Sequence, residues 1–65
     1  MAIRILKRND VEAMTTLSRS SIYLMMDKGT FPKQIQLSER SVGWIESEVQ
    51  DWLQSRISAT RGGQA

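Results

Sequence analysis

The side chains best suited to chemistry in this chain stand together in the run Ser18-Arg19-Ser20-Ser21. An arginine guanidinium can bind both acceptors on the major-groove edge of a guanine, and serine hydroxyls hydrogen-bond to phosphates or base edges. The same run is also what an ordinary helix start looks like, because a serine in front of a helix accepts a backbone N–H bond. Taken alone, the four residues favour the ordinary helix start.

The residues that follow indicate a helix that would present this run. Ile22, Met25 and Met26 have i, i+3, i+4 spacing, so they share one face that would pack on a core. Leu17 before the cap and Ile22 at the fourth helical position have the spacing of a hydrophobic staple. Gly29 suits the left-handed residue that ends a helix. We therefore expect one capped helix with a basic, polar front and an apolar back.

A short helix is expected just upstream, over residues 8–15, with Asn9 as its N-cap. Val11 and Met14 are three residues apart and would share a face. Only residues 15–18 separate the two helices, a connection typical of a helix-turn-helix. Together with the staple and the preceding helix, this short connection favours a DNA-recognition helix over an ordinary helix start.

Downstream, the alternating run 33–37 and the run 42–44 predict a two-stranded hairpin with the polar tip 38–41. Such a hairpin is marginal alone and must pack on a helix. Basic residues at its tip could lie along phosphates or enter a minor groove, or could simply form a solvated edge that discourages aggregation. The candidate DNA contacts are Ser18, Arg19, Ser20, Ser21, Tyr23 and Lys28 on the helix, and Lys33, Gln36, Ser38, Arg40 and Ser41 on the hairpin. Arg40 is the strongest hairpin candidate and Gln36 the weakest.

The two ends of the chain complete the predicted scaffold. Residues 3–6 predict a short strand or extended arm, with Ile3 and Ile5 on one face. Residues 45–57 predict a last helix, whose apolar stripe is Ile45, Val49, Trp52, Leu53 and Ile57. Trp44 and Trp52 are interpreted as core residues rather than as platforms for bases. We predict an α+β, mainly helical fold: a small winged helix-turn-helix with three helices and a two-stranded β-hairpin wing, over residues 1–57, with a flexible tail at 58–65.

Composition argues against most enzyme classes. The 65 residues contain no cysteine and no histidine, which removes disulfides, Cys- or His-ligated metal sites and a histidine general base. So short a chain has little core around which to build a deep pocket. Glu46 and Glu48 point different ways on a helix, so they are not expected to bind a metal. We expect no catalytic residue, no metal, no cofactor and no small-molecule substrate.

The charge distribution is more informative than the total. The net charge is +2, and seven of the nine Lys and Arg residues fall within residues 1–40. The basic surface therefore lies in the first two thirds of the chain, and a basic balance suits a nucleic-acid partner. Neither a membrane span nor a signal peptide is expected, and the predicted compartment is the cytoplasm.

Several motifs of the chain occur together in one known family. They are Leu17-Ser18-Arg19-Ser20 with Ile22-Tyr23, Gly29 with Phe31-Pro32, Val42-Gly43-Trp44, and Glu48-Val49 with Trp52-Leu53. From about Ile5 to Ile57 the sequence resembles the AlpA family of prophage regulatory proteins, which are short winged-helix proteins related to MerR-type DNA-binding domains and to phage excisionases.

The resemblance implies a sequence-specific double-stranded DNA-binding protein of a prophage or other integrative element. It would act as a transcriptional regulator, as an excisionase that bends attachment-site DNA and steers the integrase, or as both. The family's recognition-helix role carries over to Arg19, Ser20, Ser21 and Tyr23, and its wing role to Lys33 and Arg40. Besides DNA, the integrase and other copies of the chain on DNA are the partners to consider.

Leu24 departs from the family pattern, which commonly has a basic residue directly after Ile22-Tyr23. A leucine there could touch a thymine methyl group or face a neighbouring protomer, so it joins the candidate DNA contacts. The alternative hypothesis is a protein-interaction module, such as a phage antirepressor, that uses the acidic last helix. The two hypotheses differ in the salt dependence of duplex binding, which should be steep only for the DNA-binding protein.

Overall fold

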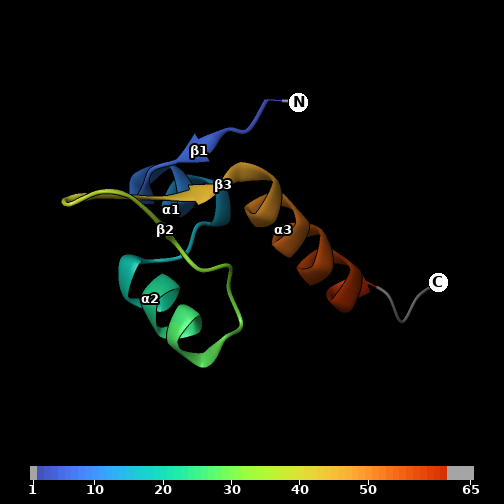
Figure 1. Cartoon of the computed structure of the whole chain (residues 1–65). Coiled ribbons are helices and arrows are strands. Elements are labelled where there is room, and N and C mark those ends of the chain that lie inside the picture. The colour runs from blue at the N-terminus through green and yellow to red at the C-terminus, as the bar shows by residue number, and fades with distance from the viewer. Residues whose placement is uncertain (1, 62–65) are drawn as a thin grey trace.

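The computed structural model describes residues 2–61 of the chain (Figure 1). The elements follow in the order β1 (Ile5–Leu6), α1 (Arg8–Thr15), α2 (Arg19–Lys28), β2 (Ile35–Ser38), β3 (Ser41–Ile45) and α3 (Glu46–Arg61). Three helices and the β2–β3 hairpin are present as predicted, so the α+β winged helix-turn-helix class is confirmed. The tip of the hairpin is the two-residue turn Glu39-Arg40, which is shorter than the predicted loop 38–41.

The sheet has a third strand that was not predicted as part of it. The strand order is β1-β3-β2, with both pairs antiparallel, and Leu6 pairs with Trp44 in the centre. Leu6 is 7% exposed, whereas Ile3 and Ile5 are 74% and 38% exposed. The apolar face of the N-terminal run is therefore the outer one, and Leu6 is the residue that reaches the core.

The helix-turn-helix is built from α1, the connection 16–18 and α2. The N-cap position of α1 is Lys7, whose backbone N–H donates to the Asp10 carboxylate at 3.2 Å. The prediction of Asn9 as the cap was wrong, because Asn9 already lies within the first helical turn. Thr16 ends α1 with a φ of 58°, a left-handed conformation that turns the chain toward α2.

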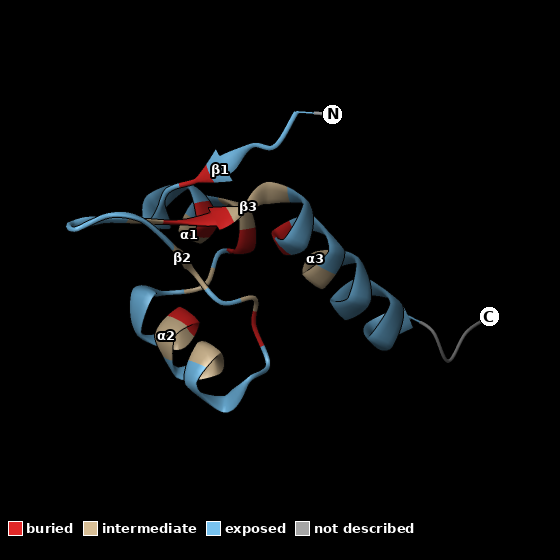
Figure 2. Cartoon of the chain, viewed as in Figure 1, coloured by how far each residue is buried: buried red, intermediate tan, exposed pale blue. Residues whose placement is uncertain are grey.

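One hydrophobic core joins the hairpin to the helices (Figure 2). Its buried members are Leu6, Val11, Ile22, Phe31, Trp44 and Val49. Trp44 is fully buried and its indole N–H donates to the Pro32 carbonyl at 3.1 Å, while Trp52 donates to the Thr30 carbonyl at 2.7 Å. Both tryptophans are thus packing residues, as predicted, and each fixes the turn that follows α2.

The last helix is longer than predicted. It continues past residue 57 to Arg61, and its second half projects away from the rest of the molecule (Figure 1). Val49 is buried, Trp52 and Leu53 are partly buried, and Ile57 is 46% exposed. The predicted apolar stripe therefore leaves the core before it ends.

Residues 62–65 of the expected tail lie outside the described residues. Among the described helices, none combines the length and the hydropathy that a membrane span requires.

Candidate DNA-binding surface

The position of α2 is fixed at both ends by the chain itself. The Ser18 hydroxyl accepts a hydrogen bond from the Ser21 backbone N–H at 3.2 Å, as expected of an N-cap. Gly29 ends the helix at a φ of 78°, and its N–H reaches the Met26 carbonyl at 3.1 Å. Between the caps Ile22 is fully buried, with Met25 and Met26 packed against the core. The predicted back of the helix is confirmed.

The opposite face of α2 is open. Arg19, Ser20 and Lys28 are exposed, and Leu24 is 54% exposed. Ser20, Leu24 and Lys28 have i, i+4, i+8 spacing and lie opposite Ile22, whereas Arg19, three residues before Ile22, lies at the side of this face. The helix therefore offers a face with a cation at each end and an apolar side chain between them, and no described element covers Leu24.

The Arg19 side chain packs on the Tyr23 ring, and the Tyr23 ring packs on the core. The Arg19 guanidinium carbon lies 5.8 Å from the centroid of the Tyr23 ring. The Tyr23 ring in turn meets the buried Trp44 edge-on, with 6.5 Å between centroids. Cation–π contact and edge-to-face packing both favour this arrangement. The position of Arg19 is therefore supported by Tyr23, which is in turn fixed by Trp44. The sequence did not indicate the Tyr23–Trp44 contact, because the two residues are distant in the chain.

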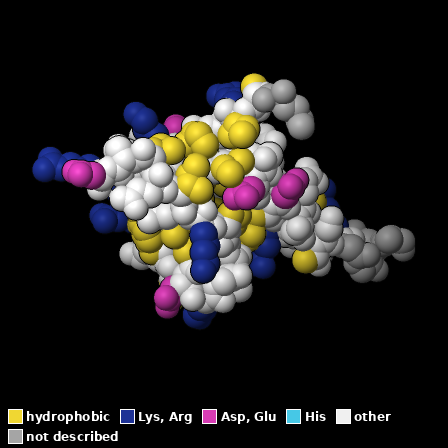
Figure 3. All heavy atoms as spheres, viewed as in Figure 1, with side chains coloured by type: hydrophobic (Ala, Val, Ile, Leu, Met, Phe, Trp, Pro, Cys, Tyr) yellow, Lys and Arg dark blue, Asp and Glu magenta, His cyan; other side chains and the backbone are white. Residues whose placement is uncertain are grey.

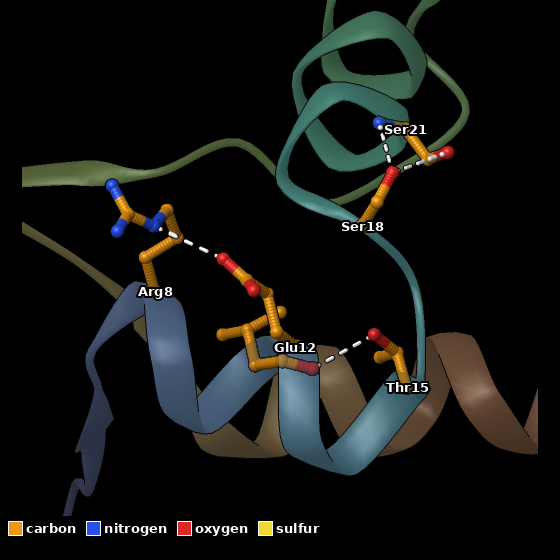
Figure 4. A network of polar contacts seen from close by, with 6 residues as sticks. Arg8, Glu12, Thr15, Ser18 and Ser21 are labelled. Atoms are coloured by element: carbon orange, nitrogen blue, oxygen red, sulfur yellow. Dashed lines mark hydrogen bonds and ion pairs between the residues drawn. The ribbon is translucent and has the colours of Figure 1, made fainter.

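The serines of the first turn are not equally available (Figure 4). Ser18 is engaged twice with Ser21, accepting from its backbone N–H and donating to its hydroxyl oxygen at 3.0 Å. Ser21 is half-buried and already accepts this bond, whereas Ser20 is exposed. Ser20 is thus the serine with the greatest freedom to bind a ligand, and Ser18 acts first as the cap.

The hairpin candidates all lie on the surface. Lys33, Gln36, Ser38, Arg40 and Ser41 are exposed. Arg40 stands in the turn at the tip beside an acidic neighbour, Glu39. In the view of Figure 1 the tip and the first turn of α2 point to the same side of the molecule, and Figure 3 shows Lys and Arg side chains at the tip and around α2.

The cations of this surface form no ion pairs within the described residues. In residues 2–61 the ion pairs are Arg4 with Glu46 and Arg8 with Glu12. Arg19, Lys28, Lys33 and Arg40 take part in neither pair. Their charges are therefore available to an external anion. No group of three or more Asp or Glu side chains that could hold a metal ion occurs among the described residues.

Comparison with known proteins places the chain in a family. Residues 4–57 match the family described as Prophage CP4-57 regulatory protein (AlpA). The chain belongs to the AlpA family. The match includes α1, α2, the hairpin and most of α3, so the AlpA resemblance of the separate motifs extends over the whole fold.

Two curated relatives give the AlpA assignment further weight. The chain is 40% identical over 60 residues to the uncharacterized protein ORF88 of Enterobacteria phage P4, with 92% of this chain and 68% of the relative covered. It is 39% identical over 61 residues to the DNA-binding transcriptional activator AlpA of Escherichia coli K12, with 85% of this chain and 87% of the relative covered.

Proposed function

We propose that this protein is a sequence-specific double-stranded DNA-binding protein of a prophage or other integrative element. It acts in the cytoplasm, and on the nucleoid when bound, as a transcriptional regulator, as an excisionase that bends attachment-site DNA and steers the integrase, or as both. Its DNA contacts come from the exposed face of α2, with Leu24 against base methyl groups, and from the hairpin tip. The integrase and other copies of the chain are its partners on DNA.

The observation that carries the proposal is the contrast between the two faces of α2. Ile22 is fully buried, whereas Ser20 and Leu24 on the other face, and Arg19 at its side, are exposed. A helix held in this way can enter the major groove with its first turn toward the bases, as recognition helices do. The unpaired cations at the helix ends and on the hairpin suit the flanking phosphates. The relative in Escherichia coli, the DNA-binding transcriptional activator AlpA, agrees with this function.

Arg19 provides the sharpest test. If its guanidinium binds a guanine edge, Arg19→Ala should weaken binding by about 1–3 kcal/mol and relax selectivity at one base pair. Arg19→Lys is the matched control: it keeps the charge but loses the planar fork, so it should retain the salt dependence while losing the selectivity. Both are measured by anisotropy on duplexes selected by the wild-type protein. Full affinity and selectivity in Arg19→Ala would refute this assignment.

Transcriptional control and excision control need separate measurements. DNA bending by the protein at an attachment site, with excision scored in cells, tests the excisionase role. A promoter fusion in the same cells tests the regulatory role. The absence of a salt-dependent affinity for any duplex would contradict the whole proposal and leave the acidic face of α3 as the functional surface.

A further inference from the structure

The sheet carries an apolar patch on the face turned away from the core. Trp44 is buried on the inner face of β3, so the preceding residue, Gly43, faces outward because strand residues alternate. A side chain at Gly43 would collide with Ile5 Cγ2 and would lie 3.2 Å from Leu37 Cδ1. Ile5 and Leu37 therefore close over Gly43 from the two flanking strands.

This surface, which we call the sheet patch, consists of Ile3, Ile5 and Leu37. Ile3 shares the outer face with Ile5 because the two are separated by one residue in an extended run. The three side chains are 74%, 38% and 50% exposed, and they are most of the large hydrophobic side chains exposed in the described part of the chain. Figure 3 shows hydrophobic side chains gathered over the sheet. Leu37 is the extra residue of a β-bulge, since the register steps from Gln36 to Ser38 opposite adjacent β3 residues.

One edge of the sheet patch is acidic. Ile3 lines an open hollow together with Arg4, Glu46 and Ser47, at the start of α3. Glu46 and Glu48 lie in the first turn of that helix, and acidic side chains stand beside the hydrophobic ones in Figure 3. Glu46 has only a 3.8 Å contact with the exposed Arg4, and Glu48 has no ion pair among the described residues. The complementary partner is therefore apolar with a positive charge at one side.

The C-terminal end of α3 has an apolar side chain with a positive charge beside it. Ile57 is 46% exposed, and Arg61 lies one turn further along the same side of the helix. The acids of α3 are confined to its first half and its two arginines, Arg56 and Arg61, to its second half. The second half also projects from the body, so its surface is free to reach another molecule (Figure 1). We call Ile57 and Arg61 the helix end.

We propose that the helix end of one copy docks on the sheet patch of a second copy, with Ile57 against Ile5 and Leu37 and Arg61 beside Glu46. The two surfaces lie on different parts of the chain, so the contact is head-to-tail and can add further copies without closing. The proposed contact rests on the proposed function, because copies bound to neighbouring DNA sites meet at a high effective concentration.

Disulfide trapping tests the contact without DNA, and the absence of native cysteine removes background. Leu37→Cys protein and a length-tagged Ile57→Cys protein are mixed and oxidised. The mixed disulfide should exceed both same-variant disulfides several-fold. The matched control is Ser55→Cys, exposed on the other side of α3, which should give little mixed product with Leu37→Cys. No excess over the control, or a predominance of Leu37→Cys homodimer, would overturn the head-to-tail contact.

Cooperative binding tests the same contact on DNA. The wild-type protein should bind a duplex carrying two adjacent selected sites with positive coupling, on the order of 5- to 150-fold. Ile57→Gln should abolish the coupling, Ser55→Gln should keep it, and neither should change affinity for a single-site duplex. Unchanged coupling in Ile57→Gln would refute the docking while leaving the proposed function intact. Failure of the wild-type protein to bind the single site would instead refute the function.

Discussion

Arg40 offers a quantitative test of the wing, because it is the basic residue of the hairpin tip. It is exposed in the two-residue turn between β2 and β3, and neither ion pair of the described residues includes it. Replacing Arg40 by alanine removes its charge and leaves no acidic side chain of an ion pair without its partner. Arg40→Ala should therefore reduce DNA binding without changing the fold.

The expected size follows from counting the unpaired cations proposed to contact phosphates, Lys28, Lys33 and Arg40, since Arg19 is assigned to a base edge. If each neutralises one phosphate, the slope of log affinity against log salt is about −2.7, at roughly −0.9 per contact. Raising salt from roughly 50 to 200 mM should then weaken binding about 40-fold in the wild-type protein and about 12-fold in Arg40→Ala, whose slope is about −1.8. The loss should be similar for all duplex sequences, since a phosphate contact carries no base information.

The assay is fluorescence anisotropy on a single-site duplex over that salt range, with an unrelated duplex alongside. Arg61→Ala is the matched control, because it removes the same charge from another exposed position, at the far end of α3. It should leave the slope unchanged. An Arg40→Ala slope equal to that of the wild-type protein, or an equal change in Arg61→Ala, would show that the tip does not lie on the phosphates.

Two further predictions concern α2. Leu24→Arg should tighten binding to all duplexes, because it adds a cation to a 54% exposed position between Arg19 and Lys28; unchanged or weaker affinity at matched salt would place Leu24 away from DNA. Ser18→Ala should lower the free energy of unfolding by about 0.5–2 kcal/mol, since the Ser21 N–H loses its acceptor. Urea unfolding measures this loss, and a stability equal to that of the wild-type protein would contradict the capping role.

The helix-turn-helix could be predicted from the sequence because its signals are local. Ser18 and Gly29 have side-chain and backbone properties that act within one turn of their own position, and the spacing of Ile22, Met25 and Met26 directly gives the buried face. The structure confirms each of these assignments. The candidate contact residues follow likewise from residue type and from position on the predicted helix and hairpin, and their contact with DNA stays a prediction.

What the sequence could not show depends on contacts between distant residues. β1 has two residues and finds its partner at Trp44 and Ile45, almost forty positions away, so no alternation within Ile5–Leu6 could reveal the pairing. The support of Tyr23 by Trp44 has the same origin. Periodicity placed Ile57 on the apolar stripe of α3, but it contains no information on where the body of the protein ends. The hydroxyl of Ser18 could be recognised as a cap, whereas the hydrogen bond that it donates to the Ser21 hydroxyl is visible only in the structure.

The residues of the proposed contact between copies are not equally suitable for testing it by substitution. Ile5 covers the backbone of Gly43 and sits in the strand that pairs with β3, so a polar residue there would disturb the fold as well as any docking. Leu37 belongs to a bulge on an edge strand and is half exposed, and Ile57 lies beyond the core on a projecting helix. Both side chains are about half exposed and lie outside the buried core, so changes there should disturb the fold less than a change at Ile5. An effect of Leu37 or Ile57 on association, without an effect on unfolding, would therefore report contact between copies, whereas an effect of Ile5 would not separate the two causes.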